Sequence, residues 1–353
     1  METESYLSAL TMGAKRRIVM GVDLGDMLFR HRFDPMELSG RWVAVDAFNT
    51  LYQFLSIIRQ QDGCPLMDSS GRVTSHLSGI LYRITGIIVS GAKVAFVLDG
   101  EPPEFKAETL KERAEVRSAA EAKWQESEGE ERFKYAQASS RLNEEIIEDA
   151  LRLLDCMGIA IVQAPSEGEA QAACMASRGD VDLVSSQDYD ALLFGAPRVV
   201  RNLALTGRRK LPRKKVYVDV NPEVIVLQEV LERLAIDRVQ LVEMGIMCGT
   251  DYNPGLPRVG PKTALKLIKE HGDLESVLSA RGESIENFEE IRDLFLHPPT
   301  TDDYSLRMRP PRSDEIVSFL CDERDFSEER VRKVTARLEE AYKVGQSTLD
   351  RWL

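Results

Sequence analysis

The alternation of apolar and polar positions predicts strands and helices in turn along the first part of the chain. Residues 42–45 form a short apolar run typical of a buried strand, and apolar residues recur at helical spacing over 51–58. A longer apolar helix is expected over 75–90, followed by a strand at 93–98. This order of strand, helix and strand is typical of a parallel α/β sheet.

The rest of the chain divides into a charged stretch, further strands and a helical end. Lys, Arg and Glu alternate over 103–138, which we expect to project from the core. An amphipathic helix should follow over 142–157 and end at Gly158. Later elements are expected as strands at 159–162, 181–185 and 215–218, helices after Glu223, a surface connection at 297–311 and a final helix at 327–343.

Acidic residues recur at or just after the ends of these strands and in one later turn. They are Asp46, Asp99, Glu167, Glu169, Asp188, Asp190 and Asp251. Parallel α/β folds place their active crevice at the carboxyl ends of the strands, so the seven side chains should converge there. Converging carboxylates repel one another unless divalent cations occupy the site. The pattern therefore predicts a site for divalent metal ions.

Each acidic residue also has a purely structural explanation when it is taken alone. Ser166 and Glu169 have the spacing of a helix-capping box, and Glu167 would suit the dipole of a first helical turn. Asp188 or Asp251 could cap a helix or a turn. Only the joint pattern favours metal binding.

Composition changes this picture at one point, the charge. The chain has 353 residues and a net charge of −12, whereas proteins that bind nucleic acid usually present a basic face. Two divalent ions would bring four positive charges to the acidic site. No apolar run approaches the ~20 residues of a membrane span. Five cysteines without a C-x-x-C pair indicate a reducing compartment.

Five acidic motifs resemble those of the flap endonuclease family, in the same order. They are VDA at 45–47, FVLDGEPP at 96–103, APSEGEA at 164–170, SQDYD at 186–190 and GTDY at 249–252. The resemblance covers 20–353 and is strongest to the short archaeal form. It implies a PIN-like 5′ nuclease fold, in which helices flank a central, mostly parallel sheet, with a helical arch and a helix-hairpin-helix-like DNA-binding element.

The same resemblance divides the chain into six segments. An N-terminal extension, interpreted as a misassigned start, precedes Met20. The segments are the extension (1–19), the N-terminal nuclease region with the start of the arch (20–125), the arch and connecting helix (126–158), the internal nuclease region with the helix-hairpin-helix-like element (159–275), a C-terminal helical region (276–343) and a tail that binds a sliding clamp (344–353).

The resemblance implies two Mg²⁺ ions per subunit, which Mn²⁺ can replace. The expected ligands are Asp46, Asp99, Glu167 and Glu169 for one ion and Asp188, Asp190 and Asp251 for the other, directly or through water. Two such ions ~3.5–4 Å apart can activate the attacking water and neutralise the leaving oxygen of a phosphodiester displacement. No covalent protein intermediate is required.

Basic residues just after Asp99 are expected to meet the DNA. Lys106, Arg113 and Arg117 would share one face of a helix, which alone could be a solvated charged face. By resemblance, Lys106 and Arg113 are catalytic residues that contact the scissile phosphate, at the gateway of an arch through which a free 5′ end threads.

DNA contacts are also implied outside the arch. Tyr52 would stack on the nucleotide beside the cut, or it is an ordinary core aromatic. The other expected DNA-binding residues are Arg59, Arg83, Glu167, Gly249, Asp251, Gly260 and Lys262. Gly260 and Pro261 resemble the turn that grips a duplex together with a monovalent cation, or they form a generic helix start. Arg258 stands where the family usually has glycine, which puts the cation in question.

The last residues resemble ligands of sliding clamps. Gln346, Leu349, Trp352 and Leu353 match the pattern of a glutamine, an aliphatic residue and two aromatics, with leucine in place of the last aromatic. Packing on the protein's own core is the alternative. The expected partners are branched DNA with a 5′ flap and the sliding clamp (PCNA), without a membrane. The protein is expected to be a monomer in the cytoplasm beside the nucleoid, or nuclear if eukaryotic.

The leading hypothesis is a structure-specific 5′ flap endonuclease with 5′–3′ exonuclease activity, acting in DNA replication, including Okazaki fragment maturation, and in repair. A non-catalytic, clamp-bound DNA adaptor would lack some of the metal ligands, and all seven are present. A Mg²⁺-dependent phosphatase needs an acid two residues after a nucleophilic Asp. Asp188 and Asp190 have that spacing, but a phosphatase explains neither the basic gateway nor the tail.

Overall fold

The computed structural model describes residues 22, 24–60, 62–103, 106, 142–205, 207–210 and 217–349, with the backbone alone at 207–210, 217–219 and 346–349. The expected N-terminal extension, Arg113 and Arg117, most of the arch, and the tail residues Trp352 and Leu353 lie outside the described residues.

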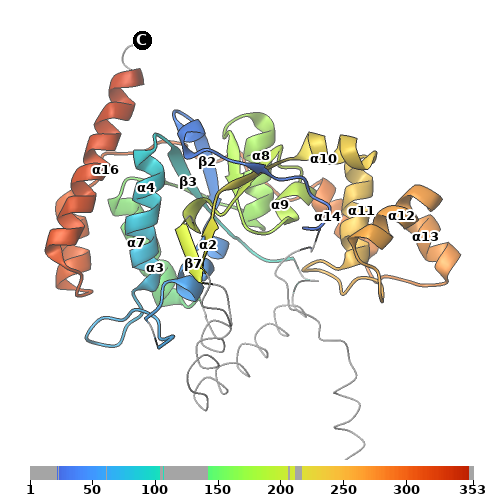
Figure 1. The fold of residues 1–353 in the computed structure, drawn as a ribbon, viewed down its shortest axis with the longest axis horizontal. Helices are drawn as coiled ribbons and strands as arrows, with labels where there is room; N and C mark the ends of the chain where they lie inside the picture. The colour runs from blue at the N-terminus through green and yellow to red at the C-terminus, as the bar shows by residue number, and fades with distance from the viewer. Residues whose placement is uncertain are drawn as a thin grey trace, which may run out of the picture.

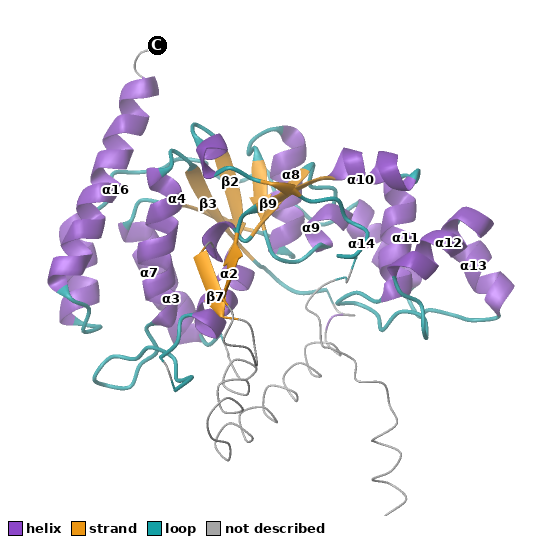
Figure 2. Ribbon diagram, viewed as in Figure 1, coloured by secondary structure: helices purple, strands orange, loops and turns teal. Residues whose placement is uncertain are grey.

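The central element is a sheet with helices on both faces (Figures 1 and 2). Among the described residues it has seven strands in the order β1-β9-β6-β5-β2-β3-β4, and β2 to β6 pair in parallel while β9 joins β6 and β1 antiparallel. The strands are β1 (His31–Arg32), β2 (Trp42–Asp46), β3 (Lys93–Leu98), β4 (Ala160–Gln163), β5 (Leu183–Ser185), β6 (Arg198–Arg201) and β9 (Glu223–Val226). The expected mostly parallel sheet is confirmed.

Alternate side chains of the central strands enter two apolar cores, one on each face. In β2, Ala44 faces one core while Val43 and Val45 face the other, as the two-residue period of a strand requires. The parallel register pairs Val45 with Phe96 and Asp46 with Val97. The carboxyl ends of β2 and β3 therefore lie side by side.

Helices cover both faces. One core lies under the helices α2, α4, α7 and α16 and the other under α8, α9 and α11. The helices are α2 (Ala47–Ile57), α3 (Ser75–Ser78), α4 (Thr85–Val89), α7 (Glu144–Cys156), α8 (Gly168–Arg178), α9 (Asp190–Leu193), α10 (Leu227–Leu234), α11 (Arg238–Cys248), α12 (Pro261–His271), α13 (Leu274–Arg281), α14 (Phe288–Leu296), α15 (Ser313–Val317) and α16 (Glu328–Leu349). Shorter helical turns are η1 (Pro35–Leu38), η2 (Gly79–Ile84), η4 (Leu203–Leu205) and η5 (Ser318–Asp322).

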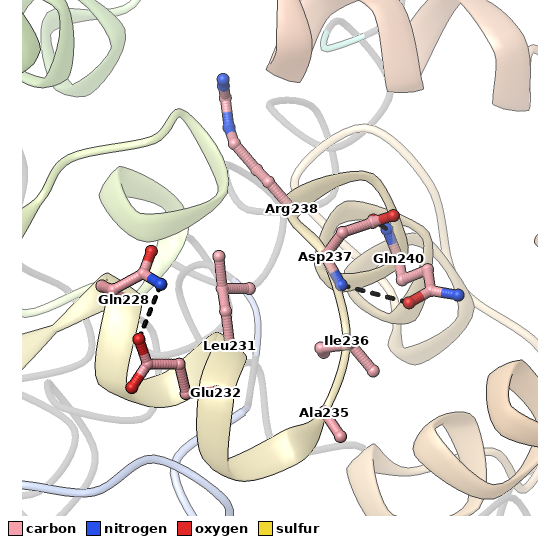
Figure 3. Close-up of a pocket in the computed structure, with 8 residues that line it drawn as sticks. All are labelled: Gln228, Leu231, Glu232, Ala235, Ile236, Asp237, Arg238 and Gln240. Carbon is pink, nitrogen blue, oxygen red and sulfur yellow. Dashed lines mark hydrogen bonds between the residues drawn. The ribbon is translucent and has the colours of Figure 1, made fainter.

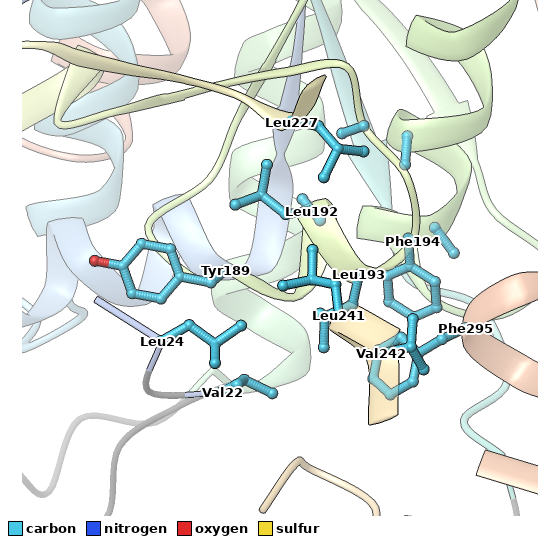
Figure 4. Packing of buried hydrophobic residues seen from close by; sticks show 14 of the residues in the cluster. Val22, Leu24, Tyr189, Leu192, Leu193, Phe194, Leu227, Leu241, Val242 and Phe295 are labelled. Carbon is cyan, nitrogen blue, oxygen red and sulfur yellow. The ribbon is translucent and has the colours of Figure 1, made fainter. Parts of the chain in front are cut away.

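Apolar packing supports the loop that carries Asp188 and Asp190. Leu192 and Leu193 of α9 lie beside Leu241 and Val242 of α11, and the N-terminal residues Val22 and Leu24 approach from the side of Tyr189 (Figure 4). The segment that follows the loop is thereby fixed in the second core, which restrains the two acidic residues before it.

One expectation for the later chain is wrong, and another is confirmed. The residues after Glu223 first form a strand, β9, because Val224 and Ile225 pair with β6 and complete the sheet. The strand expected at 215–218 is β8 (Tyr217–Val220), which pairs with β7 (Gly207–Lys210) in a separate two-stranded sheet. Local apolar pattern could not show which sheet a short strand joins.

Two expected helices differ in detail. The helix over 75–90 is present, but its middle turn, η2, is π-helical. The final helix continues beyond the expected end at 343, because α16 reaches Leu349. Gln346 and Leu349 of the expected clamp-binding tail therefore lie on the last turns of a long helix, which extends past the rest of the molecule in Figure 1. The helix over 142–157 is confirmed, and Gly158, with φ 72°, follows its end.

No helix within the described ranges is both long and apolar enough to cross a membrane. All five cysteines lie within the described residues and are free thiols.

Candidate active site

The first two acidic residues lie at the adjoining carboxyl ends of β2 and β3. Asp46 ends β2 and caps α2, because its Oδ1 accepts a hydrogen bond of 3.1 Å from the backbone N–H of Asn49. Asp99 follows β3, and its Oδ1 accepts a bond of 2.7 Å from the N–H of Gly168 at the start of α8. Backbone donors thus fix one oxygen of each carboxylate.

The two glutamates lie where β4 leads into α8. The Oγ of Ser186 donates a hydrogen bond of 2.5 Å to Oε1 of Glu169, so the residue after β5 restrains it. Glu167 occupies the N-cap position of α8 without a side-chain capping bond. The capping-box alternative for Ser166 and Glu169 is wrong, because Glu169 is held by Ser186 instead.

The last three acidic residues come from the loop after β5, the start of α9 and the turn after α11. The side chain of Asn49 donates a bond of 2.5 Å to Oδ2 of Asp188, and the backbone N–H of Val22 donates one of 2.8 Å to Oδ1 of Asp190. Asp251 lies in the turn after α11, close enough to raise the pKa of Asp190. The structure thus brings the seven carboxylates into one cluster.

Burial and mutual repulsion raise the pKa values of this cluster. Burial, and then the neighbouring Asp99, raise the pKa of Asp46 to about 8. Burial and Glu167 raise the pKa of Asp99 to about 6, and burial and Asp251 raise that of Asp190 to about 7. Burial, followed by Asp46, also raises the pKa of Glu169 well above its ordinary value. Such a cluster favours binding of positive charge.

One positive side chain enters the cluster. The Nζ of Lys106 lies 2.7 Å from Oε2 and 2.9 Å from Oε1 of Glu167, and 5.7 Å from the centre of the Tyr252 ring. Burial opposes its charge, but the surrounding carboxylates, first of all Glu167, raise the pKa of Lys106 above its ordinary value. Lys106 is therefore charged, and it offsets only one of several negative groups.

The donor set fits hard divalent cations such as Mg²⁺, since it consists of carboxylate oxygens alone. In the part of the chain that the structure describes, no three such side chains yet converge closely enough to form the shell of a single ion.

Three of the expected DNA-binding residues lie on α2, just after it and on η2. Tyr52 is half-buried on α2, one turn after Asn49. Arg59 follows α2 and donates a bond of 2.8 Å to the carbonyl of Gly63, and Arg83 on η2 donates one of 3.1 Å to the carbonyl of Ala204. Both arginines are partly buried, so their guanidinium groups are held in place.

The expected helix-hairpin-helix-like element is the pair α11 and α12 with their connecting loop. Gly249 ends α11 with φ 101°, and Gly260 precedes Pro261 as the N-cap of α12 without a side-chain capping bond. Lys262 is exposed on the first turn. Arg258, at the position where glycine was expected, has φ 63°, a left-handed conformation that favours glycine.

Several residues that position the site were missed by sequence reasoning. They are Asn49, Gln53 and Ser186, together with Arg30 and Arg201. The side chains of these two arginines donate hydrogen bonds to the hydroxyl of Tyr189. Asn49 could have been found from the sequence, because it is the third residue of a helix that Asp46 caps. The contacts of the others depend on packing between distant segments.

A pocket in the described part of the chain lies away from this cluster. It has a volume of about 500 Å³ and lies between the end of α10 and the start of α11, with Leu231, Ile236 and Arg238 on its wall (Figure 3). The polar side chains around it make hydrogen bonds within the helices. Gln228 donates to Glu232 on α10, and Asp237 and Gln240 form the capping box of α11. The pocket has none of the seven carboxylates and carries no argument for chemistry.

Comparison with known proteins agrees with this geometry. The XPG N-terminal domain matches residues 20–120 and the XPG I-region matches residues 158–251. Flap endonuclease 1 of Methanothrix thermoacetophila is 68% identical over 95% of this chain and 100% of its own length. That of Archaeoglobus fulgidus is 53% identical over 94% of this chain and 100% of its own length. The solved flap endonuclease-1 of Methanococcus jannaschii is 41% identical, with a TM-score of 0.74 over 91% of this chain and 98% of its own.

The fold, the acidic cluster and the XPG matches define a metal-dependent nuclease, a hydrolase of phosphodiester bonds. Within that class, the chain belongs to the flap endonuclease family.

Proposed function

We propose that the protein removes 5′ flaps from branched DNA by hydrolysis, with 5′–3′ exonuclease activity at nicks and gaps, in replication and repair. The observation that carries the proposal is the cluster of seven carboxylates at one edge of the sheet, with Lys106 inside it. The proposed substrate, DNA with a 5′ flap, is supported by the high identity to relatives named flap endonuclease 1 over almost the whole chain.

The seven carboxylates would hold two Mg²⁺ ions, or Mn²⁺ ions in their place. Asp46, Asp99, Glu167 and Glu169 form one ligand set, and Asp188, Asp190 and Asp251 the other. When bound, the ions activate water and stabilise the negative charge that develops on the phosphate. Carboxylates held by hydrogen bonds from Gly168, Ser186 and Asn49 supply a frame for such ions.

Lys106 and Arg113 would contact the scissile phosphate. The ammonium of Lys106 lies at the mouth of the cluster, where the chain leaves the end of β3 for the expected arch. When a phosphate enters, the ammonium can exchange Glu167 for the phosphate oxygens, because each partner is an anion. This exchange leaves Glu167 free to bind a cation.

The duplex arms would lie on both sides of this mouth. Tyr52 would stack on the base beside the cut, while Arg59 and Arg83 hold one arm. Gly249, Gly260 and Lys262 would contact the phosphates of the other arm. The loop before α12 could hold a monovalent cation there, although Arg258 replaces the usual glycine.

The tail would join the protein to a sliding clamp. Gln346 and Leu349 lie at the end of α16, and Trp352 and Leu353 follow in the sequence. We further propose that the protein works as a monomer in the cytoplasm, where archaeal DNA lies. Removal of 344–353 should abolish stimulation by the clamp and leave cleavage without the clamp unchanged.

A panel of labelled DNA substrates tests the proposed activity. With Mg²⁺, the wild type should cut a 5′ flap near its base at least about 100-fold faster than a single strand or a blunt duplex of the same sequence. A flap whose 5′ end is blocked by a bulky group should be cut more slowly. Equal rates on all substrates would contradict structure-specific cleavage.

A further inference from the structure

Asn49 joins the two groups of carboxylates. Its backbone N–H donates to Oδ1 of Asp46 at 3.1 Å, and its side-chain Nδ2 donates to Oδ2 of Asp188 at 2.5 Å. Asp46 belongs to the first ligand set and Asp188 to the second, which are 142 residues apart in the chain. Asn49 is 8% exposed, so water competes little for these two bonds.

Gln53 fixes the orientation of the Asn49 amide. Its Nε2 donates to Oδ1 of Asn49, one helical turn earlier on α2. An ionised carboxylate only accepts hydrogen bonds, so the amide must turn its Nδ2 toward Asp188 and its Oδ1 away. Gln53 donates to Oδ1 of Asn49 and so favours this orientation. In the reversed amide, Oδ1 of Asn49 would face the carboxylate oxygen of Asp188 without a donor between them.

We propose that Asn49, held by Gln53, is a positioning residue that fixes Asp188 relative to Asp46 and so sets the affinity of the second divalent ion. This inference rests on the proposed function for the identity of the ligands. The first turn of α2 thereby bonds one proposed ligand of each ion, Asp46 through the backbone and Asp188 through the side chain of Asn49.

The physical reason is that the Asn49 amide bonds the carboxylate of Asp188 directly. Asp188 follows a short strand, β5, in a loop rather than in a helix or strand of its own. Its backbone N–H bonds Ser186 Oγ at 3.1 Å, a bond of the main chain, whereas the bond from Asn49 Nδ2 acts on the carboxylate itself. A partner that orients a ligating carboxylate is typically worth about 10- to 100-fold in metal affinity.

The first ligand set should not depend on the Asn49 side chain. Asp46 is held by the backbone N–H of Asn49, which every substitution except proline retains. Asp99 is held by the N–H of Gly168, and Glu169 by Ser186. A positioning role therefore predicts a selective effect on one of two ions, whereas a general structural role predicts loss of both.

Mn²⁺ binding measured by electron paramagnetic resonance on the full chain tests the inference. The wild type should bind two ions. Asn49→Leu, of similar size and without the donor, should bind the first ion within about 2-fold of wild type and the second about 10- to 100-fold more weakly. Gln53→Glu should shift the second ion in the same direction by a smaller factor, since a carboxylate cannot donate to Oδ1 of Asn49.

Three controls separate positioning from other roles. Phe48→Leu, on the same helix but packed against the apolar core, should leave both ions unchanged. The melting temperature in EDTA should be similar for all variants. High Mg²⁺ should restore flap cleavage by Asn49→Leu to within a few-fold of wild type, because the proposed role of Asn49 is to hold a ligand of the ion. A catalytic role would leave the rate low at any Mg²⁺ concentration.

Unchanged binding of the second ion in both Asn49→Leu and Gln53→Glu overturns the inference, and so does equal weakening of both ions or a wild type that binds one ion only. If Asn49→Leu does not fold, Asn49→Ser and Gln53→Glu decide. A wild type that binds two ions but cuts no flap contradicts the proposed function and leaves the positioning role of Asn49 standing.

Discussion

The ammonium of Lys106 lies 2.7 Å from Oε2 of Glu167, inside the cluster of carboxylates. Both side chains are nearly buried, so the contact is strong but costs desolvation of two charges. It gives the metal-free protein a positive charge of its own at the site where divalent ions are proposed to bind. We therefore expect Lys106 to have two roles, one before the ions bind and one when the phosphate arrives.

Replacement of Lys106 separates these roles. In EDTA, Lys106→Ala should destabilise the protein by about 2–4 kcal/mol, because it leaves buried carboxylates without a counter-charge. Mg²⁺ should recover most of this loss, and Mg²⁺ should bind more tightly than to wild type because no ammonium competes for Glu167. Urea denaturation with and without Mg²⁺ measures both effects. Lys106→Arg, which keeps the charge, is the control; a Mg²⁺ affinity lower than that of wild type in Lys106→Ala would contradict the competition.

A methyl group at Gly168 should disturb Asp99. A Cβ there would lie 2.7 Å from Oδ1 of Asp99, so the carboxylate or the start of α8 must shift. We expect Gly168→Ala to weaken the binding of the first ion about 10-fold or more. Mn²⁺ titration measures this. Gly86→Ala is the control, because a Cβ there meets nothing within 4 Å and should leave ion binding unchanged.

Stabilisation by Mg²⁺ should grow as the pH rises. The pKa values of Asp46, Asp99 and Asp190 in the folded protein, about 8, 6 and 7, lie above their ordinary value of 3.8. Bound protons therefore stabilise the metal-free fold; this contribution is complete below pH 3.8 and is lost as the pH rises through 6 to 8. Mg²⁺ replaces those protons, so its effect increases over the same range.

Melting curves at two pH values check this dependence. The increase in Tm caused by Mg²⁺ should be larger at pH 8.5 than at pH 6.5 by about 3 °C or more. His76, fully buried, acts in the opposite direction at lower pH, since burial lowers its pKa to about 4. Its contribution to stability is lost as the pH falls from about 6.5 to 4, and it cancels when melting temperatures with and without Mg²⁺ are compared at one pH. An equal Mg²⁺ shift at both pH values would contradict the raised pKa values.

Arg258 should be replaceable by glycine with a gain in stability. Its φ of 63° lies in the left-handed region, which costs an L residue about 1–2 kcal/mol relative to glycine. Glycine also loses more entropy on folding, so the expected gain from Arg258→Gly is about 0.5–1 kcal/mol. Urea denaturation measures it. Arg258→Ala, which keeps the strained backbone, should show no such gain, and a gain of the same size in that variant would rule out backbone strain as the cause.

The acidic cluster could be predicted because its residues follow from local pattern. Strands such as β2 and β3 are strongly apolar, and in a parallel sheet their carboxyl ends must lie at one edge. Asp46 and Asp99 are therefore placed by the sequence alone. The short strand β9 was missed, since Glu223–Val226 has too few residues to distinguish a strand from the start of the helix that follows.

The residues that hold the cluster could not be predicted in the same way. Asn49 meets Asp188 across 139 residues, and Val22 meets Asp190 across 168. Such contacts depend on how α2 and the N-terminal segment pack beside the loop after β5. No local signal marks them. The contact between Lys106 and Glu167 could not be predicted either. The resemblance implied that Lys106 contacts a phosphate, and only the structure shows its ammonium bonded to Glu167.

The most direct test of the account compares wild type with Asp188→Ala on an end-labelled double-flap DNA, measuring cleavage in Mg²⁺ and DNA binding in Ca²⁺. The account predicts a cut near the flap base that falls at least about 1,000-fold in the variant, while DNA affinity changes by less than about 3-fold, because the carboxylate serves the ions and not the duplex. Cleavage at the wild-type rate by Asp188→Ala would contradict the central role of the acidic cluster.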